Sequence, residues 1–522
     1  SKELKFKLSS YDVDIRTTGD TEIILYCYLV FGPKIFKELN GIFAFAIYDN
    51  NKLIIVRDHI GVKPLYYYTC DNQFVFASEI KGIFAYGIKP SLNNDSWCEI
   101  IGLGPAHTLG NGVFSSIKEV LPGHYLTITM DSDKKILYSD DCYWKLKSKI
   151  HSDDYATTVS HCNYLITDSI KRQMVSDIPI CTFLSGGLDS SLVSSVVNSK
   201  KLNTYSFDFV GNDKNFKSNS FQVSRDRPYV DIMKDFLGSN HTYLECNNEN
   251  QINCLFKAVD ARDMPCMADV ESSMLYFCKL VSEKCRVTLT GECADEIFGG
   301  YPWFHRSDML NQCTFPWSYD MYARTYLFKD DFINHLNIEE YVQNAYETSV
   351  NECEYLPEEN ATETKRRKIC WLNVRWFMMT LLTRMDRCSM YSGLEARVPF
   401  ADYRILEYVF NIPWTFKCYN NQPKSLLVEC GKDYLPNSIL YRKKTPYPKT
   451  YDPLYEKILG EMVLDEYNSN ASLRNIVDRT KLEKFINSPK DYGKPWYGQL
   501  MAGPQMLAYI LQIGYWMRKY NL

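Results

Sequence analysis

The sequence predicts a two-domain protein in which a layered α+β domain precedes an α/β domain built on a parallel sheet. The chain has 522 residues, which is enough for two or three domains. Apolar segments with the pattern of strands crowd residues 1–130, whereas strand and helix patterns alternate from residue 153 onward. The polar stretch 131–152 separates these regions, and we interpret it as a linker.

The composition indicates a globular protein with no nucleic-acid or membrane partner. Hydrophobic residues make up 45% of the chain and charged residues 23%, as in ordinary globular proteins. A net charge of −4 argues against nucleic-acid binding, and no apolar run approaches the roughly 18 residues that a membrane helix needs. The eighteen cysteines are scattered without CxxC pairs, so we expect reduced thiols in a cytoplasmic protein.

Residues 1–130 contain the patterns of two β-hairpins, a further strand and two helices. The clearest hairpin joins Phe43–Asp49 to Leu53–Arg57 through the turn Asn50-Asn51-Lys52. The remaining predicted elements are a hairpin of 65–68 with 73–77, a strand that ends at Ile128, and helices over 21–31 and 79–86. Strands that outnumber helices in this way favour a layered α+β domain.

From residue 153 onward, strand and helix patterns alternate. After a helix over 153–175, we expect strands at 178–184, 204–209, 241–246 and 286–290, and helices at 190–198, 229–237, 251–262 and 271–284. This alternation predicts a parallel sheet with helices on both faces, and ligands bind such sheets at the carboxyl ends of the strands. A long helix is expected over 363–390, and the tail from Lys443 onward is expected to be irregular and aromatic.

The stretch Ile178–Ser191 contains the most informative motif. Its strand stops at Ser185-Gly186-Gly187 and turns directly into a helix. Two glycines let the backbone approach a ligand, and the start of the helix offers free N–H groups to an anion. Asp189 would repel a phosphate unless a cation such as Mg2+ lies between them. The pattern therefore favours a nucleotide phosphate with its metal, and a glycine-rich turn without a ligand is the alternative.

The stretch Leu289–Tyr301 repeats this arrangement, with a strand, a glycine and then acidic residues that enter a helix. Glu292, Asp295 and Glu296 fall within about one helical turn. Carboxylates this close repel one another unless cations or proton transfers use them. Helix capping explains one of these acidic residues more readily than all three.

Two further stretches carry charge, and each also has a structural explanation. Arg384–Met390, which leads into Gly393–Phe400, could be a salt-bridged helix end. Lys424 and the basic group Arg442-Lys443-Lys444 could bind phosphate, although a lone lysine on a surface helix is commoner. No GxxxxGK[ST] loop is present and Gly102-Leu-Gly104 lacks a third glycine, so Walker and dinucleotide loops are excluded.

Together and in this order, these stretches resemble the glutamine-dependent asparagine synthetases. Ser185–Ser190 resembles that family's pyrophosphate loop, Leu289–Tyr301 its second signature, and Gly393–Phe400 its G-L-E-A-R-V-P-F box. In the first domain, the segments 19–22, 39–45, 57–65 and 77–81 are similar to the family's glutaminase domain. Tyr441–Thr450, Pro495–Leu500 and Cys293-Ala294 are similar to a bacterial branch of the family.

The resemblance implies a fold and a reaction. It implies an incomplete Ntn-type glutaminase domain over 1–130, a linker over 131–152, and over 153–522 an ATP-pyrophosphatase domain of the adenine nucleotide alpha hydrolase type with a helical C-terminal part. It further implies that ATP, with Mg2+, converts aspartate into β-aspartyl-AMP, which ammonia then attacks. Glutamine supplies this ammonia in the family. The resemblance leaves the assembly open, with a homodimer as one candidate.

The resemblance also implies roles for individual residues. Glu292 would accept protons from the attacking ammonia, Lys424 would neutralise pyrophosphate, and Arg387 would face a carboxylate or phosphate. Asp189 and Asp295 would hold Mg2+. ATP and its pyrophosphate would contact Leu184, Ser185, Gly186, Gly187, Leu188, Asp189, Ser190, Ser191, Phe209, Thr290 and Gly291.

The glutaminase part departs from the family pattern. The family begins with a cysteine whose thiol and α-amino group hydrolyse glutamine, and we find no counterpart in this sequence. Of the residues that hold glutamine, Asp20 has a counterpart, matching the aspartate that binds the α-amino group. We therefore expect the chain as given to use free ammonia and to release no glutamate from glutamine. Val428 stands where many relatives have arginine after the Lys-x-x-Leu pattern.

Two other functions stay open on this evidence. An enzyme of the same fold that amidates a larger carboxylate would form AMP and pyrophosphate without asparagine. A non-catalytic homologue is the second alternative, and the intact Ser185–Ser191, Glu292 and Asp295 argue against it.

Overall fold

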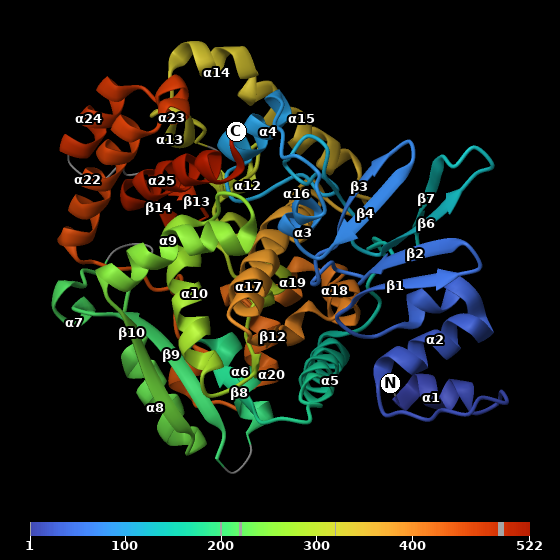
Figure 1. Ribbon diagram of the computed structural model, residues 1–522. Helices are drawn as coiled ribbons and strands as arrows, with labels where there is room; N and C mark the ends of the chain where they lie inside the picture. Colours follow the sequence, from blue (N-terminus) through green and yellow to red (C-terminus); the bar gives the residue numbers. More distant parts are fainter. Residues whose placement is uncertain (1, 199–200, 219–221, 319, 489–494, 499) are drawn as a thin grey trace. The chain divides into compact units, whose positions relative to one another are not determined.

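The chain folds into two compact units, which Figure 1 colours along the sequence. The computed structural model describes residues 2–198, 201–218, 222–318, 320–488, 495–498 and 500–522. The first unit consists of Ser1–Ile83 and Lys118–Leu146, and the second of Phe84–Ile117 and Lys147–Leu522. Residues 84–117 thus group with the second unit. The division into domains at 1–130, 131–152 and 153–522 rests on sequence patterns and stays a prediction.

Two antiparallel sheets form the centre of the first unit, and both predicted hairpins are confirmed. One sheet has the order β1-β2-β6-β7 and the other β4-β3-β5. The strands are β1 (Ala44–Asp49), β2 (Lys52–Arg57), β3 (Tyr66–Cys70), β4 (Gln73–Ala77), β5 (Lys118–Glu119), β6 (His124–Met130) and β7 (Ile136–Cys142). The helices are α1 (Lys2–Leu8), α2 (Asp20–Phe31), the 3-10 helix Gly32–Glu38 and α3 (Ile80–Ala85).

A two-residue turn fixes the register of β1 and β2. Asp49 pairs with Lys52, and the two residues between them, Asn50 and Asn51, have φ values of 45° and 67°. A turn with both central residues in the left-handed region matches the right-handed twist of the strands, and asparagine tolerates that region better than most residues. This turn keeps Ile47 and Ile54 on the buried side of the pair.

Strand β7 lies in the stretch 131–152 that the sequence analysis assigned to a linker. Ile136–Cys142 pairs along its whole length with β6 and forms an edge of the sheet. Its burial pattern is mostly exposed, and its centre is Ser139-Asp140-Asp141. Polar residues protect an edge strand from further pairing, so the same composition that suggested a linker also suits this strand.

A parallel five-stranded sheet organises the second unit, as predicted. Its strands lie in the order β10-β9-β8-β11-β12, and all neighbours run parallel. They are β8 (Ile180–Phe183), β9 (Asn203–Phe209), β10 (Asn240–Cys246), β11 (Val287–Leu289) and β12 (Glu395–Arg397). The chain passes from β8 to β9 on one side, whereas β11 joins β8 on the other. The order therefore reverses beside β8, which is where open α/β sheets bind ligands.

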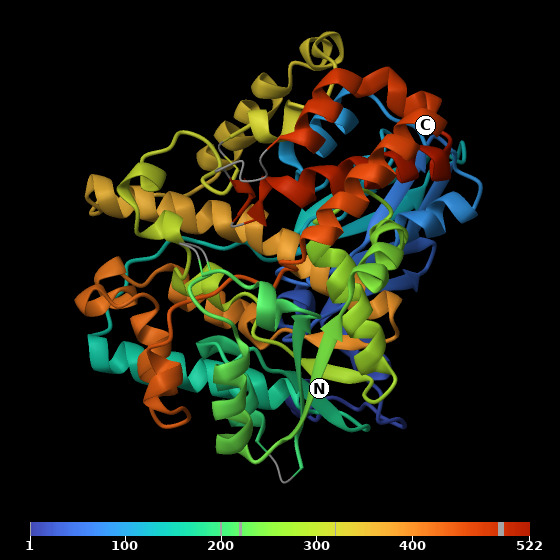
Figure 2. The same cartoon turned by 90° about the vertical axis from the view of Figure 1, so that its left-hand side faces the viewer.

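Alternating side chains of β9 and β10 bind helices on both faces of this sheet. Phe207 and Leu244 are register partners and cluster with Phe277 of α10 (Ala268–Ser282), whose ring stacks on Phe207 at 4.5 Å. On the opposite face, Tyr243 lies under Arg227 of α8 (Arg227–Leu237). Figures 1 and 2 show α8 and α10 on opposite sides of β9 and β10. This is the period-two arrangement expected for a sheet covered on both faces.

Helices make up most of the remaining second unit. The predicted helix over 363–390 is confirmed as α16 (Ala361–Leu372), a π-helical segment over Asn373–Met378 and α17 (Met379–Tyr391). The other helices before residue 443 are α4 (Asn94–Trp97), α5 (Tyr155–Gln173), α6 (Leu188–Val197), α7 (Asn212–Asn215), α9 (Asn248–Arg262), α11 (Ala294–Phe298), α12 (Ser307–Leu310), α13 (Tyr322–Thr325), α14 (Asp330–Leu336), α15 (Ile338–Asn351), α18 (Tyr403–Phe410), α19 (Trp414–Lys417), α20 (Ser425–Gly431) and α21 (Asn437–Leu440).

The expectation of an irregular tail from Lys443 onward is wrong beyond residue 452. Four helices follow, α22 (Pro453–Ser469), α23 (Ala471–Ile476), α24 (Arg479–Asn487) and α25 (Ala502–Tyr520), with the short strands β13 (Pro495–Tyr497) and β14 (Leu500–Met501) before the last. Asp452 caps α22 and Pro453 occupies its first turn, where proline is favourable. The buried side chains of Tyr455, Leu459 and Val463 recur every four residues, so a helical signal was present among the aromatic residues.

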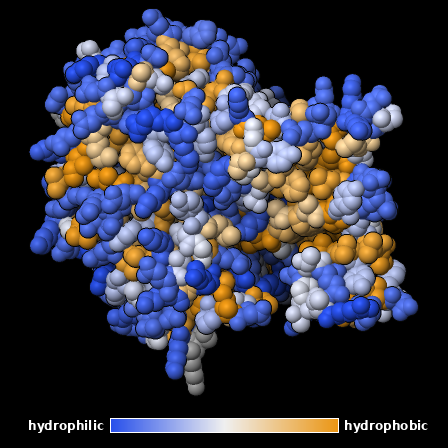
Figure 3. Space-filling model, viewed as in Figure 1, coloured by the Kyte–Doolittle hydropathy of each residue, from blue (hydrophilic) through white to orange (hydrophobic). Residues whose placement is uncertain are grey.

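The surface and the thiols agree with a globular composition. Within the part of the chain that the structure describes, no helix has the length and apolar character needed to cross a membrane. Figure 3 shows hydrophilic and hydrophobic residues mixed on the face in view, and exposed large side chains include Phe6, Leu29 and Tyr48. All eighteen cysteines are free thiols.

Candidate active site

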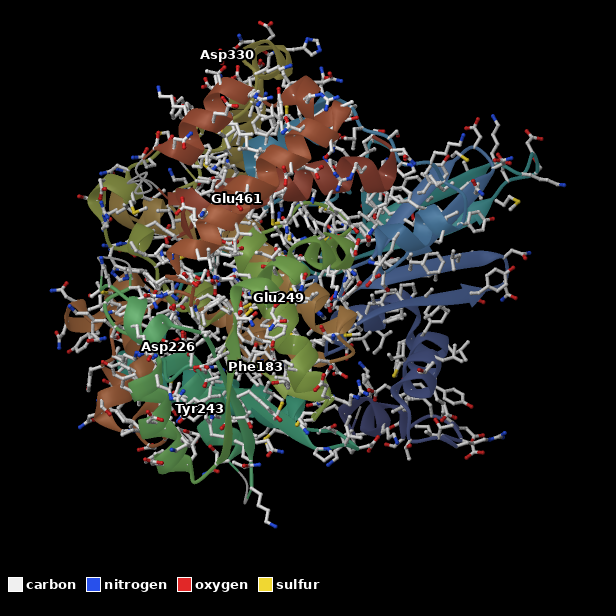
Figure 4. The ribbon with its side chains drawn as sticks, turned by 60° about the vertical axis from the view of Figure 1, so that its left-hand side comes forward. Phe183, Asp226, Tyr243, Glu249, Asp330 and Glu461 are labelled. Atoms are coloured by element: carbon white, nitrogen blue, oxygen red, sulfur yellow. The ribbon has the colours of Figure 1, made fainter. Side chains whose placement is uncertain are left out.

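A cavity of about 820 Å³ lies in the second unit, at the carboxyl ends of β8 and β11. Phe183, Asp226 and Tyr243, which Figure 4 labels, contribute to its lining from three different segments. Most of the residues that the sequence analysis selected also line it, namely Leu184, Ser185, Gly187, Leu188, Asp189, Ser190, Thr290, Gly291, Glu292, Asp295 and Lys424.

The loop from Ser185 to Ser190 forms a cradle at the start of α6. The hydroxyls of Ser185 and Ser190 lie 2.9 Å apart, and Ser190 Oγ accepts the N–H of Ser185 at 3.1 Å. Gly187 is the N-cap of α6, and no side chain caps this helix. The first N–H groups of α6 and the positive end of its dipole are therefore directed toward the cavity lining, which suits a phosphate group.

Glycine is required at two close approaches beside this cradle. Gly186 has φ of 68°, and a Cβ atom there would lie 2.6 Å from the backbone carbon of Tyr229. A Cβ atom on Gly291 would lie 2.7 Å from the backbone nitrogen of Ser190. Gly291 thus lets the β11 loop pack directly on the start of α6, which brings the two sequence motifs into one site.

Lys424 bridges two carboxylates from these two motifs. Its Nζ donates to Asp189 Oδ1 at 2.6 Å and Oδ2 at 2.9 Å, and it lies 2.9 Å from Asp295 Oδ1. Lys444 pairs with the other oxygen of Asp295. Lys424 itself precedes α20 with φ of 53°, an unusual backbone conformation for lysine. The two carboxylates and two ammonium groups form a charge-balanced cluster on the wall of the cavity.

Burial and neighbouring charges shift the pKa values of this cluster. Burial and the nearby Asp295 raise the pKa of Asp189, although Lys424 opposes the shift. Burial also disfavours the charged form of Asp295, but Lys424 and Lys444 outweigh it and hold the pKa of that carboxyl well below its usual range. Despite its burial, Lys424 has a raised pKa because Asp189 and Asp295 flank it. The lysine therefore stays charged between the two carboxylates.

The third acidic residue of the second motif lies in a different environment. Burial, together with Asp295, raises the pKa of Glu296 to about 7. Tyr301 donates its hydroxyl to Glu296 Oε1, and both side chains are buried. The three carboxylates within about one turn thus differ in environment: Asp295 pairs with two lysines, Glu296 binds its proton more tightly than a free glutamate, and Glu292 has a separate partner.

Glu292 forms an ion pair with an arginine of α17. Arg384 donates to Glu292 Oε1 at 2.8 Å and Oε2 at 3.1 Å, and both residues line the cavity. Arg387 of the same helix was expected to face a carboxylate or phosphate. Arg387 is buried but is not among the described residues that line the cavity. The helix faces the cavity through the row of Leu381, Arg384 and Met385.

Arg442 ties a C-terminal loop to the cradle. It donates to the carbonyl oxygen of Ser185 at 2.9 Å and to Asp226 at 2.5 Å, and Thr445 also donates to Asp226 at 3.0 Å. Its guanidinium group lies over the ring of Tyr229 at 4.1 Å. The basic group is evident from the sequence, but its partner Asp226 is not, because it lies 216 residues away from Arg442.

Four other selected residues lie outside the described lining. Gly186 packs against Tyr229, and Ser191 is buried with a hydroxyl that has no hydrogen-bond partner in the described structure. The side chain of Phe209 is buried with Cys246 and Phe277. Asp20 belongs to the first unit, where it is the exposed first residue of α2. The predicted roles of these residues therefore stay predictions.

The donor set of the cavity suits a hard divalent cation bound together with phosphate. In the described ranges, no three His, Cys, Asp or Glu side chains form a ready metal site. Asp189 and Asp295 nevertheless supply carboxylate oxygens that converge on one point, Lys424 Nζ. Mg2+ commonly uses one or two carboxylates with phosphate oxygens and water rather than a complete protein cage. The residues present therefore fit a magnesium ion that arrives with a nucleotide.

Comparisons with known proteins match both parts of the chain. The asparagine synthase family model matches residues 161–518, and the glutamine amidotransferase domain model matches residues 1–144. The chain is 40% identical over 534 residues to asparagine synthetase [glutamine-hydrolyzing] 3 of Bacillus subtilis, covering 100% of this chain and 86% of that protein. It is 27% identical to asparagine synthetase 1 of the same organism, covering 94% and 78%. It is 26% identical to asparagine synthetase B of Escherichia coli, covering 88% and 70%.

Proposed function

Because the chain belongs to the asparagine synthase family, we propose that it catalyses the ATP-dependent amidation of aspartate to asparagine, with glutamine as the nitrogen donor. The observation that carries this proposal is the position of Lys424 between Asp189 and Asp295, at the start of α6. A cation between carboxylates, beside free helix N–H groups, suits a departing pyrophosphate with its metal.

The reaction proceeds in two steps. The β-carboxylate of aspartate attacks the α-phosphorus of ATP, the bond from that phosphorus to the bridging oxygen of pyrophosphate breaks, and β-aspartyl-AMP forms. Ammonia then attacks the acyl carbon, the nitrogen loses a proton, and AMP departs with the bonding electrons of the acyl–oxygen bond. Activation is needed because the free carboxylate is an anion and a poor electrophile.

The residues of the cradle bind and orient the phosphates. Ser185, Gly187 and Ser190 present hydroxyl and N–H donors to the pyrophosphate, and Lys424 neutralises charge as pyrophosphate departs. Leu184, Thr290 and Gly291 form the wall for the nucleoside. Gly186 and Ser191 act by shaping the turn from which these donors project.

Glu292 is the proposed acceptor of the proton from the attacking nitrogen. Its two hydrogen bonds from Arg384 fix the orientation of the carboxylate, so that a proton acceptor is held at the cavity surface. Arg384 therefore replaces Arg387 as our candidate for the arginine that acts at this site.

Asp189 and Asp295 would hold Mg2+ when the nucleotide binds. The ion would offset the negative charge that develops on the departing phosphates. Lys424 would then pair with the phosphate oxygens in place of Asp189 and Asp295.

We also propose a location and an assembly for the protein. A cytoplasmic location agrees with eighteen free thiols, most of them buried. A homodimer is the assembly that we propose to examine by light scattering.

A product assay tests the proposed function. The chain is incubated with ATP, Mg2+ and aspartate, and with either glutamine or ammonium chloride as nitrogen source. We expect asparagine, AMP and pyrophosphate in equal amounts with at least one nitrogen source. Formation of AMP and pyrophosphate without asparagine would show that aspartate is activated but not amidated. Absence of all three products would favour an amidating enzyme for a larger carboxylate, which the assay does not contain, or a non-catalytic homologue.

A further inference from the structure

The second unit contains another cavity, of about 220 Å³, beside the N-terminal part of α16 and the short helix α19. Glu359, Glu363, Arg366, Arg367, Trp414 and Lys417 contribute to its lining. None of the described residues that line it also lines the catalytic cavity. The space is smaller than the roughly 300–1,000 Å³ of pockets for drug-sized ligands, but it has room for a small organic acid.

Two of the cations in this cavity are already paired. Arg367 forms an ion pair with Glu359 at 2.5 Å, and Arg366 forms one with Glu363 at 2.9 Å. Glu363 also accepts the backbone N–H of Trp414 at 3.2 Å. Glu358, a further carboxylate of the lining, is exposed to solvent at the rim. Glu359 and Glu363 are thus each paired with an arginine, although Glu359 Oε2 is buried and has no hydrogen-bond partner in the described structure.

Lys417 is a buried cation without a comparable partner. Its side chain is 3% exposed and lines the cavity, and within the described ranges no carboxylate forms an ion pair with it. Burial lowers its pKa below the usual range, and the field of Arg367 acts in the same direction, whereas Cys370, Glu363 and Cys162 oppose the shift. Since a buried ammonium group without a counter-ion is costly, its position beside a cavity needs an explanation.

Among the described residues that line this cavity, Arg366 provides a second unpaired hydrogen-bond donor. Arg366 Nε is buried and has no hydrogen-bond partner in the described structure, while the Arg366 guanidinium lies over the ring of Trp414 at 4.9 Å. An oxyanion accepts hydrogen bonds from both an ammonium group and a guanidinium N–H. It would supply the negative charge that Lys417 lacks and the acceptor that Arg366 Nε lacks.

We propose that this cavity is a binding site for a small oxyanion, a carboxylate or a phosphate of single net charge, with Lys417 as its principal ligand. The site is separate from the catalytic cavity and does not depend on the function proposed above. Lys417 lies in the buried part of the cavity, and Glu358, which forms no ion pair among the described residues, lies in its exposed part, so one negative charge suffices to balance Lys417.

Thermal unfolding of the full chain tests the site. Unfolding temperatures are measured in sodium acetate, sodium phosphate and sodium chloride at equal ionic strength, for the wild type, Lys417→Met and Lys365→Met. Lys365 is the control because it is an exposed lysine of α16, a helix that contributes Glu363, Arg366 and Arg367 to the cavity, and does not line the cavity itself. The acetate and phosphate arms distinguish the two sources of oxyanion.

At least one oxyanion should raise the unfolding temperature of the wild type and of Lys365→Met by a few degrees relative to chloride. Lys417→Met should lose this increment. In chloride, its unfolding temperature should equal or exceed that of the wild type, because an uncompensated buried charge has been removed. Phosphate that binds the catalytic cradle should raise the unfolding temperature of all three proteins equally. This increment therefore cancels when the proteins are compared.

The proposal is overturned if neither oxyanion distinguishes the wild type from Lys417→Met. An unchanged far-ultraviolet circular dichroism spectrum and a single cooperative unfolding transition show that the variant is folded. If Lys417→Met does not fold, Lys417→Gln is measured in its place, and an increment in Lys417→Gln equal to that of the wild type overturns the proposal.

Discussion

Arg384 donates two hydrogen bonds to the carboxylate of Glu292, at 2.8 and 3.1 Å, across the cavity in which we place the reaction. The pair joins α17 to the loop after β11. The two residues are 92 positions apart in the sequence. Their contact separates the role of Glu292 from that of the neighbouring acidic residues, which interact with lysines and with Tyr301.

Replacing Glu292 by alanine should stop amide formation while adenylation continues. We expect asparagine formation to fall by about 10²- to 10⁴-fold, the usual contribution of a general base, and aspartate-dependent exchange of labelled pyrophosphate into ATP to persist. Glu283→Ala, at an exposed glutamate after α10, serves as the control and should leave both rates unchanged. Equal rates of asparagine formation in Glu292→Ala and the wild type would show that another group takes the proton.

Replacing Lys424 by methionine should impair both catalysis and stability. Pyrophosphate exchange should fall by about 10²- to 10³-fold, as when a preorganised charge-stabilising group is lost. The free energy of unfolding should fall by roughly 3–5 kcal/mol, because Asp189 loses its cation and Asp295 keeps only Lys444. Chemical denaturation without Mg2+ measures the stability.

The double variant Asp189→Asn, Lys424→Met separates these two effects. Removing the carboxylate as well should restore part of the stability but none of the exchange activity. A double variant that is no more stable than Lys424→Met would show that the buried charge of Asp189 is not the origin of the loss.

Glu296 should make the stability of the protein depend on pH. Its pKa is raised to about 7 in the folded protein, whereas a free glutamate has a pKa near 4.3. Below the unfolded pKa both states bind the proton. As the pH rises from about 4.3 to 7, the unfolded state loses it first, so the stabilising contribution of neutral Glu296 is lost across this window.

Comparison with Glu296→Gln measures that contribution. The difference in unfolding free energy between wild type and variant should change by on the order of 3 kcal/mol between pH 4 and pH 7.5, to the disadvantage of the wild type. The glutamine keeps the size and the hydrogen bond to Tyr301 without titrating. A difference that does not vary with pH would mean that Glu296 has an ordinary pKa in the folded protein.

Alanine at Gly186 should disrupt the cradle through a steric clash. A Cβ atom there meets the Tyr229 backbone at 2.6 Å, in addition to the strain of φ at 68°. Gly238→Ala is the matched control, because Gly238 has φ of 59° but no atom within 4 Å of its added Cβ. The control should lose about 1 kcal/mol of stability from strain.

Gly186→Ala should lose more stability than this control and should also lose pyrophosphate exchange, which Gly238→Ala keeps. Denaturation curves and exchange rates of the two variants, measured side by side, test the clash. Equal losses of stability in Gly186→Ala and Gly238→Ala would show that the loop moves away from the added Cβ atom without a cost in free energy.

The sequence predicts the parts of the site that depend on local pattern. Ser185–Ser190 and Gly291 end strands whose apolar runs are evident, and parallel strands bring such ends to one edge of a sheet. Contacts that depend on tertiary packing do not follow from pattern. Arg384 and Arg387 are equivalent by composition, and only the packing of α17 decides which faces the cavity. Asp226 carries no local signal, because its partner Arg442 is 216 residues away.

The fold likewise divides into elements that follow from local sequence pattern and elements that do not. The hairpin of β1 and β2 follows from alternation and from asparagines at its turn, so it was predicted correctly. Strand β7 was missed because an edge strand can be as polar as a linker. The tail that contains α22 is aromatic, which favours an irregular segment, and its helical signal lies only in the four-residue spacing of Tyr455, Leu459 and Val463.

The π-helical segment between α16 and α17 determines in which directions the side chains of this continuous helix point. Fourteen positions separate Glu363, in the smaller cavity, from Phe377, in the catalytic one. In an uninterrupted α-helix, at about 100° per residue, their side chains would be only about 40° apart. A π-turn accommodates one extra residue without adding rotation, which widens the angle to about 140°. The continuous helix from α16 to α17 can thereby line both cavities. Deleting one residue from 373–378 would make the helix regular and keep Glu363 and Phe377 facing their cavities.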